Sequence, residues 1–223
     1  MHRLRVKLRK LTSNRGYVII ALMSALKQLY QEIEHCQICE LAKSRTRVVP
    51  GEGAENASLF FIGEAPGWHE DQQGRPFVGP AGQYLEQLLA AIGLKREQVY
   101  IANVIKCRPP GNRDPLPGEI QSCCKWLDRQ IELVHPKMII TLGRYSLARY
   151  FPGESISKVH GKAKTQNDVI YYAMYHPAAA LHQGSLRKII EADMHKIPEI
   201  LAQAEKIAEA GTEPRQLSFR LGE

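Results

Sequence analysis

The chain has 223 residues, of which 44% are hydrophobic and 24% charged, a composition typical of one globular domain with a sizeable core. The formal net charge is +7, but residues 1–22 hold six basic and no acidic residues, which leaves 24 basic against 23 acidic residues elsewhere. The overall charge is therefore no evidence of nucleic-acid binding, and the apolar run 17–23 is too short to cross a bilayer.

Composition divides the chain into a folded domain and two ends. Residues 1–22 are expected to be a disordered or dispensable basic extension, in preference to a nucleic-acid-binding arm or a transit-type peptide. Residues 23–204 are expected to form the working domain, and residues 205–223 a polar tail.

Strands and helices are predicted to alternate along this domain. Four short apolar runs end in turn-forming residues and are predicted strands: 58–63, 99–104, 137–143 and 169–177. None alternates between apolar and polar residues, which is typical of strands buried on both faces of a parallel sheet. Apolar residues at helical spacing predict helices at 85–92, 117–134, 144–151 and 186–197. The pattern predicts an α/β sandwich around a parallel sheet.

Polar groups gather where the predicted strands end. The four strands run into the sequences GEAPG (63–67), NVIKCRPPGNR (103–113), LGRYS (142–146) and YHPAAAL (175–181). Ligands of parallel α/β sheets bind in the crevice beyond the carboxyl ends of the strands. These segments are therefore expected to share one site.

Five cysteines are distributed over three segments. A disulfide framework is improbable in a core of this size with an odd cysteine count and no secretory signal. Cys36 and Cys39 form a close pair, Cys107 follows a strand and Cys123 lies in a helix. Four thiolates from three segments suit either an iron–sulfur cluster or a tetrahedral zinc ion. Adjacent helical residues point about 100° apart, so only one of Cys123 and Cys124 is expected to be a ligand.

Several long motifs in one order make the chain resemble the type-4 uracil-DNA glycosylases, the iron–sulfur branch of the uracil-DNA glycosylase superfamily. The motifs are GEAPGWHEDQQGRPFVGPAG (63–82), NVIKCRPPGNRDPLPGEIQSC (103–123), LGRYS and MYHPAAALHQGSLR (174–187). The resemblance implies a three-layer αβα sandwich around a four-stranded parallel sheet. It also implies a [4Fe–4S] cluster and hydrolysis of the uracil–deoxyribose bond in DNA during base-excision repair. The implied cluster ligands are Cys36, Cys39, Cys107 and Cys123.

The resemblance also assigns the two catalytic roles. Glu64 would stabilise the positive charge that develops on the sugar and orient the attacking water. His176 would donate a hydrogen bond to O2 of uracil as the base leaves as an anion. No lysine is clearly placed to form a Schiff base, so a monofunctional enzyme is expected, without strand cleavage.

Four further residues are implied to bind the base. Phe77 would stack on the flipped uracil, although a lone Phe is more often a core residue. Asn103 would accept from N3–H and donate to O4, in preference to a turn-forming role. Backbone N–H groups of the loop around Ala65 would hold O2, and Glu70 would lie near C5 and exclude the methyl group of thymine. For Glu70 the alternative is a solvated acidic pair with Asp71.

The partner implied by these roles is uracil-containing DNA. Contacts with phosphates or with the space left by the flipped base are expected from five residues: Lys106, Arg108, Arg113, Leu181 and Arg187. A monomer is expected, with no membrane, a cytoplasmic, nucleoid-associated location and downstream repair proteins as further partners.

Two other classes of function fit parts of the sequence. A non-catalytic iron–sulfur or zinc module that binds nucleic acid would explain the cysteines and the basic loops. It would not need Glu64, Asn103 and His176 at strand ends. A phosphate-binding enzyme is disfavoured because GEAPG lacks the lysine of a P-loop and the glycine spacing of a dinucleotide site.

Overall fold

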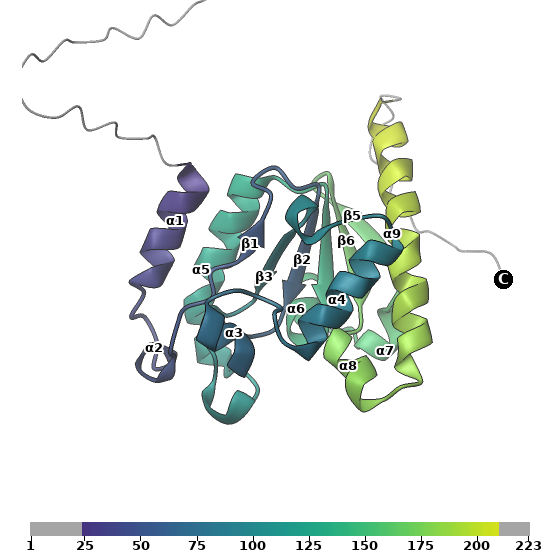
Figure 1. The fold of residues 1–223 in the computed structure, drawn as a ribbon. Helices are drawn as coiled ribbons and strands as arrows, with labels where there is room; N and C mark the ends of the chain where they lie inside the picture. Colours follow the sequence, from purple (N-terminus) through teal and green to yellow (C-terminus); the bar gives the residue numbers. More distant parts are fainter. Residues whose placement is uncertain (1–23, 210–223) are drawn as a thin grey trace, which may run out of the picture.

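The computed structural model describes residues 24–209, with side chains to residue 203, and contains one sheet with helices on both faces (Figure 1). The basic extension 1–22 and residues 210–223 of the predicted tail lie outside the described residues, so the division of the chain stays a prediction. The last helix, α9 (Leu186–Glu209), continues past the predicted domain end at 204. No helix in the described part of the chain is long and apolar enough to cross a membrane.

The sheet has six strands in the order β1-β3-β2-β4-β6-β5. Its four central strands are mutually parallel and correspond to the four predicted runs: β3 (Tyr100–Asn103), β2 (Leu59–Gly63), β4 (Met138–Leu142) and β6 (Val169–Met174). The two edge strands, β1 (Glu52–Gly53) and β5 (Ala163–Gln166), are antiparallel to their neighbours. The expected four-stranded parallel sheet is therefore wrong in extent, because it is the centre of a larger mixed sheet.

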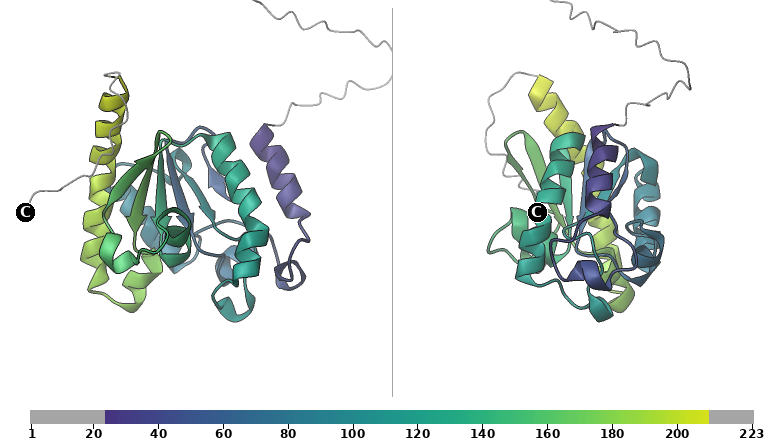
Figure 2. Two further views of the ribbon diagram at one scale, coloured as in Figure 1. Left: turned by 180° about the vertical axis from the view of Figure 1, so that it is seen from behind. Right: turned by 90° about the vertical axis from the view of Figure 1, so that its left-hand side faces the viewer.

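The buried strands explain why both faces of the sheet are covered. In β2, Leu59 and Phe61 pack into the apolar cluster formed with helices α4 (Pro80–Ala91) and α9. Phe60 and Ile62, which point the other way, pack with α1 (Ala25–Glu34) and α5 (Pro117–Val134). Figure 2 shows these two helical layers on opposite sides of the sheet.

The second face is completed by two shorter helices. α6 (Arg144–Tyr150) and α7 (Ile156–Val159) bury Leu147 and Val159 against Ala173 of β6, which points away from the α9 side. The sheet is thus the middle of three layers.

The parallel strands bring their carboxyl ends to one edge of the sheet. Gly63 pairs with Asn103, and Leu142 with Met174. Short elements follow these ends or connect the larger ones: α2 (Leu41–Ser44), α3 (Trp68–Gln73), η1 (Arg96–Gln98), η2 (Pro110–Asn112) and α8 (Pro177–His182). Of these, α3 and α8 both lie towards the lower edge of the molecule in Figure 1.

Candidate active site and cysteine pocket

Gly63, the last residue of β2, has no side chain, so the ring of Phe77 and the amide of Asn103 can both approach it closely. A Cβ atom on Gly63 would lie 2.4 Å from Oδ1 of Asn103 and 2.6 Å from Cζ of Phe77. Among the described residues no donor reaches Oδ1 of Asn103, although this oxygen is buried. Because an unpaired buried acceptor is costly, the arrangement suits a ligand that brings an N–H group to this point.

We expect Gly63→Ala to impair this site without preventing folding. The added methyl group would displace Asn103 or Phe77, and overpacking of this kind costs about 1–3 kcal/mol. The value of kcat/KM on uracil-DNA should fall, as measured by single-turnover kinetics, and the melting temperature should fall slightly. Gly118→Ala in α5 is the matched control, because a Cβ atom there meets nothing within 4 Å. A Gly63→Ala enzyme with wild-type kcat/KM would contradict the close approach.

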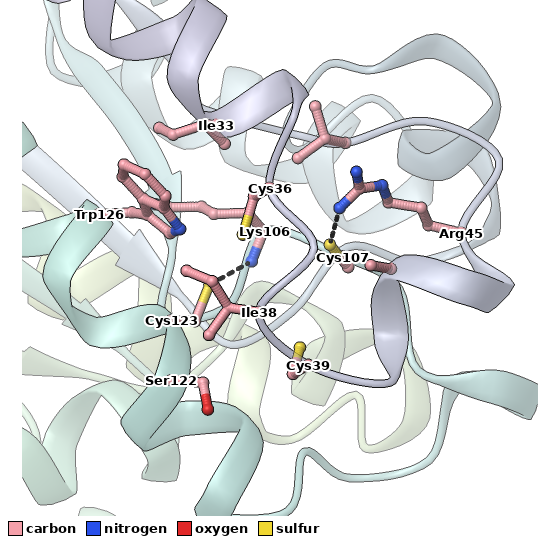
Figure 3. Close-up of a pocket in the computed structure, with 12 residues that line it drawn as sticks. Ile33, Cys36, Ile38, Cys39, Arg45, Lys106, Cys107, Ser122, Cys123 and Trp126 are labelled. Atoms are coloured by element: carbon pink, nitrogen blue, oxygen red, sulfur yellow. Dashed lines mark hydrogen bonds between the residues drawn. The ribbon is translucent and has the colours of Figure 1, made fainter.

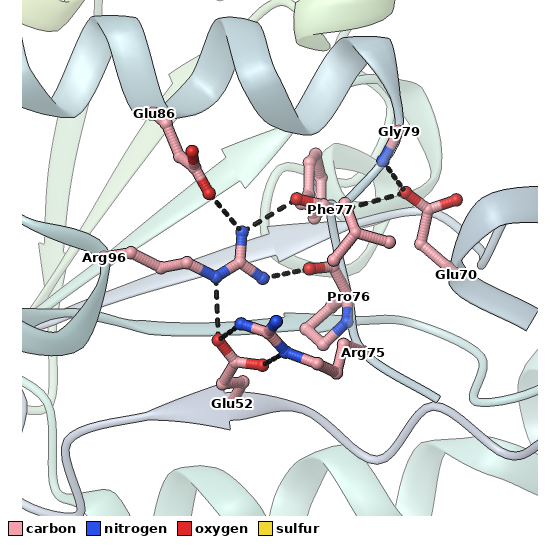
Figure 4. Close-up of polar contacts among 9 residues, drawn as sticks. Glu52, Glu70, Arg75, Pro76, Phe77, Gly79, Glu86 and Arg96 are labelled. Carbon is pink, nitrogen blue, oxygen red and sulfur yellow. Dashed lines mark hydrogen bonds and ion pairs between the residues drawn. The ribbon is translucent and has the colours of Figure 1, made fainter. Parts of the chain in front are cut away.

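Phe77 is held in an unusual backbone conformation by Arg96 (Figure 4). Its φ angle is +52°, and its side chain is only 5% exposed. The guanidinium of Arg96, from η1, donates to the carbonyl oxygen of Phe77 at 2.7 Å and also to that of Pro76. The same guanidinium bonds to the carboxylates of Glu52 and Glu86. Four acceptors thus fix one buried cation, which in turn fixes the loop before α4.

Glu70 supports the same loop from the other side. Its carboxylate accepts hydrogen bonds from the backbone N–H groups of Gly67, Val78 and Gly79, at 3.1, 2.9 and 2.8 Å. The alternative of a solvated acidic pair is wrong, because Glu70 is only partly exposed and bonded to backbone, and Asp71 is buried and accepts from the backbone N–H of Thr46 at 2.9 Å. The contact of Glu70 with C5 of a base stays a prediction.

His176 presents a neutral imidazole beside Phe77. It lies just beyond β6 at the N-terminus of α8, where its Nδ1 accepts from the N–H of Ala178 at 3.1 Å. Burial lowers the pKa of His176 to about 4, although the charge of Glu70 opposes this effect. The proton of the neutral ring is therefore on Nε2, which is a donor. The imidazole stacks on the Phe77 ring with centroids 5.4 Å apart.

Glu64 is a half-buried carboxyl group whose pKa is well above its usual value. It follows β2, and its carbonyl oxygen accepts from the N–H of Ile105 at 3.2 Å. Burial, and then the charge of Asp114, raise the pKa of Glu64 to about 7, whereas Arg144 lowers it. No hydrogen bond within the described residues uses the N–H of Ala65, which is next in the chain. The end of β2 thus offers a base and a backbone donor together.

The residues predicted to contact DNA differ in how freely they are exposed. Leu181, in α8, is 50% exposed and suits a residue that inserts into a duplex. Each of the three arginines is bonded to a neighbour: Arg108 to Asn112 at 2.6 Å, Arg113 to Glu119 at 2.6 Å and Arg187 to Glu191 at 3.0 Å. Their contacts with phosphates stay predictions.

The prediction that Lys106 contacts DNA is wrong for this conformation. Its side chain is only 1% exposed, and Nζ donates to the carbonyl oxygen of Asn103 at 2.9 Å and to Oε1 of Gln130 at 2.7 Å. Burial lowers the pKa of Lys106 to about 8. An ammonium held between two buried acceptors cannot reach a phosphate.

The four predicted cysteine ligands line one pocket (Figure 3). Cys36 and Cys39 follow α1, Cys107 follows β3 and Cys123 lies in α5. Cys124 does not line the pocket, and its thiol donates to the carbonyl oxygen of Gln121 at 3.0 Å. The structure therefore separates the two adjacent cysteines.

As they are placed, the cysteines do not form a ready site for a single ion. Tetrahedral zinc, with Zn–S bonds of about 2.3 Å, needs sulfur atoms roughly 4 Å apart. Within the described residues, no three His, Cys, Asp or Glu side chains can hold one metal ion. Burial raises the pKa of Cys123 to about 12, so its thiol stays protonated unless a metal replaces the proton.

Comparison with known proteins agrees with this arrangement. Residues 50–196, which contain the strand-end residues described above, match the Uracil DNA glycosylase superfamily. The chain belongs to the uracil-DNA glycosylase superfamily. A type-4 uracil-DNA glycosylase of Sulfurisphaera tokodaii is 49% identical over 80% of this chain and 86% of its own length.

Two further relatives carry the same description. Type-4 uracil-DNA glycosylases of Saccharolobus solfataricus and Archaeoglobus fulgidus are 47% and 46% identical, over 81% and 80% of this chain. They are covered over 88% and 94% of their own lengths. The resemblance to the type-4 branch of the uracil-DNA glycosylases, inferred from the motifs, is confirmed.

The residues that support this site carry little local signal. Arg96 stands in the charged stretch KREQ (95–98), which has the pattern of a solvated turn. Gln130 is an unremarkable helical residue whose amide binds Lys106, the carbonyl oxygen of Pro50 and the hydroxyl of Tyr100. Only the three-dimensional arrangement reveals these supporting roles.

Proposed function

We propose that this chain is a monofunctional uracil-DNA glycosylase that hydrolyses the bond between N1 of uracil and C1′ of deoxyribose, leaving an abasic site. One observation carries the proposal above all others. The buried, unpaired Oδ1 of Asn103 lies at the same edge of the sheet as an aromatic ring, an imidazole donor and a carboxyl group of raised pKa.

Asn103 and Phe77 would recognise the base. Once the nucleotide has left the stack, N3–H of uracil donates to Oδ1 of Asn103, and the amide N–H donates to O4. Cytosine presents the opposite pattern and would leave these groups unpaired. Phe77 supplies an apolar face, and stacking on an aromatic side chain contributes about 1–3 kcal/mol per base.

His176 and Glu64 would carry the chemistry. As the C1′–N1 bond breaks, its electron pair moves into the uracil ring, and Nε2–H of His176 stabilises the charge on O2. The carboxylate of Glu64 stabilises the positive sugar and accepts a proton from the water that attacks C1′. Because uracil leaves as an anion, no second carboxylic acid is needed.

The relatives' names support the same activity, since each is called a type-4 uracil-DNA glycosylase. A non-catalytic nucleic-acid-binding module is disfavoured, because binding alone requires neither a carboxyl group of raised pKa nor a neutral imidazole donor at the same edge of the sheet.

The test uses an end-labelled duplex with a single uracil, incubated with the protein and then treated with alkali. We expect cutting at uracil only after alkali, and none in a duplex with thymine at that position. Cutting without alkali would contradict a monofunctional enzyme. No cutting by iron-replete protein would contradict the proposed activity.

The pH dependence should report on Glu64. Single-turnover rates should rise about tenfold per pH unit below pH 7 and level off above it, because Glu64, with a pKa of about 7, must lose its proton to accept another. His176 should add no second limb in this range, since its pKa is about 4 and it is already neutral.

Arg144 provides a way to move this profile. Its cation lowers the pKa of Glu64, so Arg144→Gln should shift the rising limb to higher pH. Arg129→Gln is the matched control, because Arg129 is an exposed arginine in an ion pair with Glu32 and is not among the charges that act on Glu64. An unchanged limb in Arg144→Gln would show that Glu64 is not the titrating group.

The four-cysteine pocket would hold a [4Fe–4S] cluster. A four-iron cluster takes one thiolate on each iron, which fits four cysteines that line one pocket. When bound, the cluster would tie the segment after α1, the loop after β3 and helix α5 together. Its role here is structural, so removal of iron should lower the melting temperature and DNA binding together.

We also propose that the enzyme acts as a monomer on uracil-containing DNA. The exposed Leu181 would fill the space of the flipped base, and the arginines at the rim would contact phosphates with a salt-dependent affinity. A nucleoid-associated, cytoplasmic location and contacts with downstream repair proteins stay predictions.

A further inference from the structure

A buried cation without a carboxylate partner lies beside the cysteine pocket. The ammonium of Lys106 is bonded to two neutral acceptors, the carbonyl oxygen of Asn103 and the side-chain oxygen of Gln130. None of the ion pairs within the described residues includes Lys106, and nearby Asp128 is paired with Arg149 instead. An isolated charge in a protein interior costs several kcal/mol unless opposite charge lies close to it.

Beyond these two acceptors, the pocket cysteines act on this cation: the charges that raise the pKa of Lys106 are those of Cys123, Asp128 and Cys107, in that order. Lys106 lines the pocket together with the four cysteines, and its backbone N–H donates to Sγ of Cys123 at 3.3 Å. A second cation, Arg45, donates to Sγ of Cys107 at 3.1 Å (Figure 3). Arg45 also lines the pocket. Two cations therefore line the same pocket as four thiols that would become thiolates on binding a metal.

We propose that Lys106 is the buried counter-charge of the group that the four cysteines bind. The inference rests on the cluster in the proposed function and adds a residue that would not be a ligand. Four thiolates and an iron–sulfur core in its common 2+ state leave a dianion, which Lys106 and Arg45 together neutralise.

The alternative is that Lys106 only fills space and satisfies two acceptors. The two roles differ in one respect: a counter-charge stabilises the iron-loaded protein more than the iron-free protein, whereas a packing role affects both equally. A thermodynamic cycle of substitution and iron occupancy isolates this difference.

The experiment compares wild-type protein with Lys106→Met, which keeps the length of the side chain but removes its charge. Gln130→Met is the matched control, because it breaks bonds to Lys106, Pro50 and Tyr100 without changing any charge. Each protein is purified without oxygen. The measurements are iron and sulfide content, melting temperature with and without iron, and the rate at which a chelator removes iron from the loaded form.

We expect Lys106→Met to lose iron to the chelator on the order of tenfold faster, which corresponds to about 1.4 kcal/mol. Its melting temperature should fall more in the loaded form than in the iron-free form, whereas Gln130→Met should show equal falls. Equal falls for Lys106→Met, with a wild-type release rate, would overturn the proposal.

Two outcomes separate this proposal from the proposed function. If wild-type protein binds no iron, the proposed cluster is wrong. If wild-type protein binds iron and Lys106→Met releases it at the wild-type rate, only the counter-charge proposal is wrong. Should Lys106→Met fail to fold, Lys106→Gln keeps a hydrogen-bond donor without the charge and carries the same comparison. The release rate is measured on loaded protein, so it stands even where the iron-free form does not fold.

Discussion

The Glu64→Gln enzyme is expected to release uracil about 10²–10⁴-fold more slowly than the wild-type enzyme. Glutamine keeps the size and polarity of the side chain, but it can neither accept the proton of the attacking water nor stabilise a positive sugar. Binding of uracil-DNA should survive, because the proposed recognition groups are Asn103 and Phe77. Single-turnover rates and DNA affinity, measured on the same preparation, check both statements.

The same substitution should change stability in a pH-dependent way. The pKa of Glu64 is raised from 4.5 to about 7 in the folded protein, so its ionised form is disfavoured there, and the fold loses stability as the pH rises from 4.5 to about 7, after which the loss is constant. Glutamine removes this cost. The variant should therefore melt at a higher temperature than wild type at pH 8, with the gain shrinking as the pH falls through 7 and vanishing near 4.5. A variant that is slower and less stable at pH 8 would indicate a disturbed fold.

Arg96→Met is expected to cost about 3–5 kcal/mol in the free energy of unfolding, the usual effect of removing one member of a buried charge network. Glu52 would keep a carboxylate in a half-buried position, and the carbonyl oxygens of Pro76 and Phe77 would lose their donor. Since these bonds also hold Phe77 at a positive φ angle, the surviving folded protein should have a raised KM for uracil-DNA.

Arg75→Met provides the comparison for this prediction. Arg75 bonds to the same carboxylate of Glu52, but its side chain is 54% exposed, so its removal should cost at most about 1 kcal/mol. Urea unfolding of both variants measures the two losses. Similar losses for Arg75→Met and Arg96→Met would show that burial is not what makes the Arg96 interaction strong.

The central sheet could be predicted because its strands carry the strongest local signal. All five residues of β2 and of β4 are buried, and both appear in the sequence as continuous apolar runs. The edge strands carry no such signal: β1 has two residues, and β5 reads AKTQ with no buried position. Their backbone pairing depends on strands already in place, which no local pattern records.

The candidate site shows a similar division. Glu64, Asn103 and His176 could be expected at one edge because each lies at or just beyond the end of a parallel strand, whereas their roles were implied by the family resemblance. Lys106 was misjudged because a lysine beside cysteine and arginine resembles a DNA-binding loop. Its buried position depends on a bond to Gln130, which lies in helix α5. Only the packing of α5 brings Gln130 close to Lys106, and no local sequence pattern records that contact.

The order of strands has a consequence for how the enzyme is made. Glu64, Phe77 and Asn103 come early in the chain, but His176 follows β6, which must insert between β4 and β5. A ribosome-bound chain that ends before residue 176 therefore holds the proposed recognition groups without the donor for the leaving base. Catalytic competence would thus arise late during synthesis, once α9 has joined the core cluster that contains Phe77.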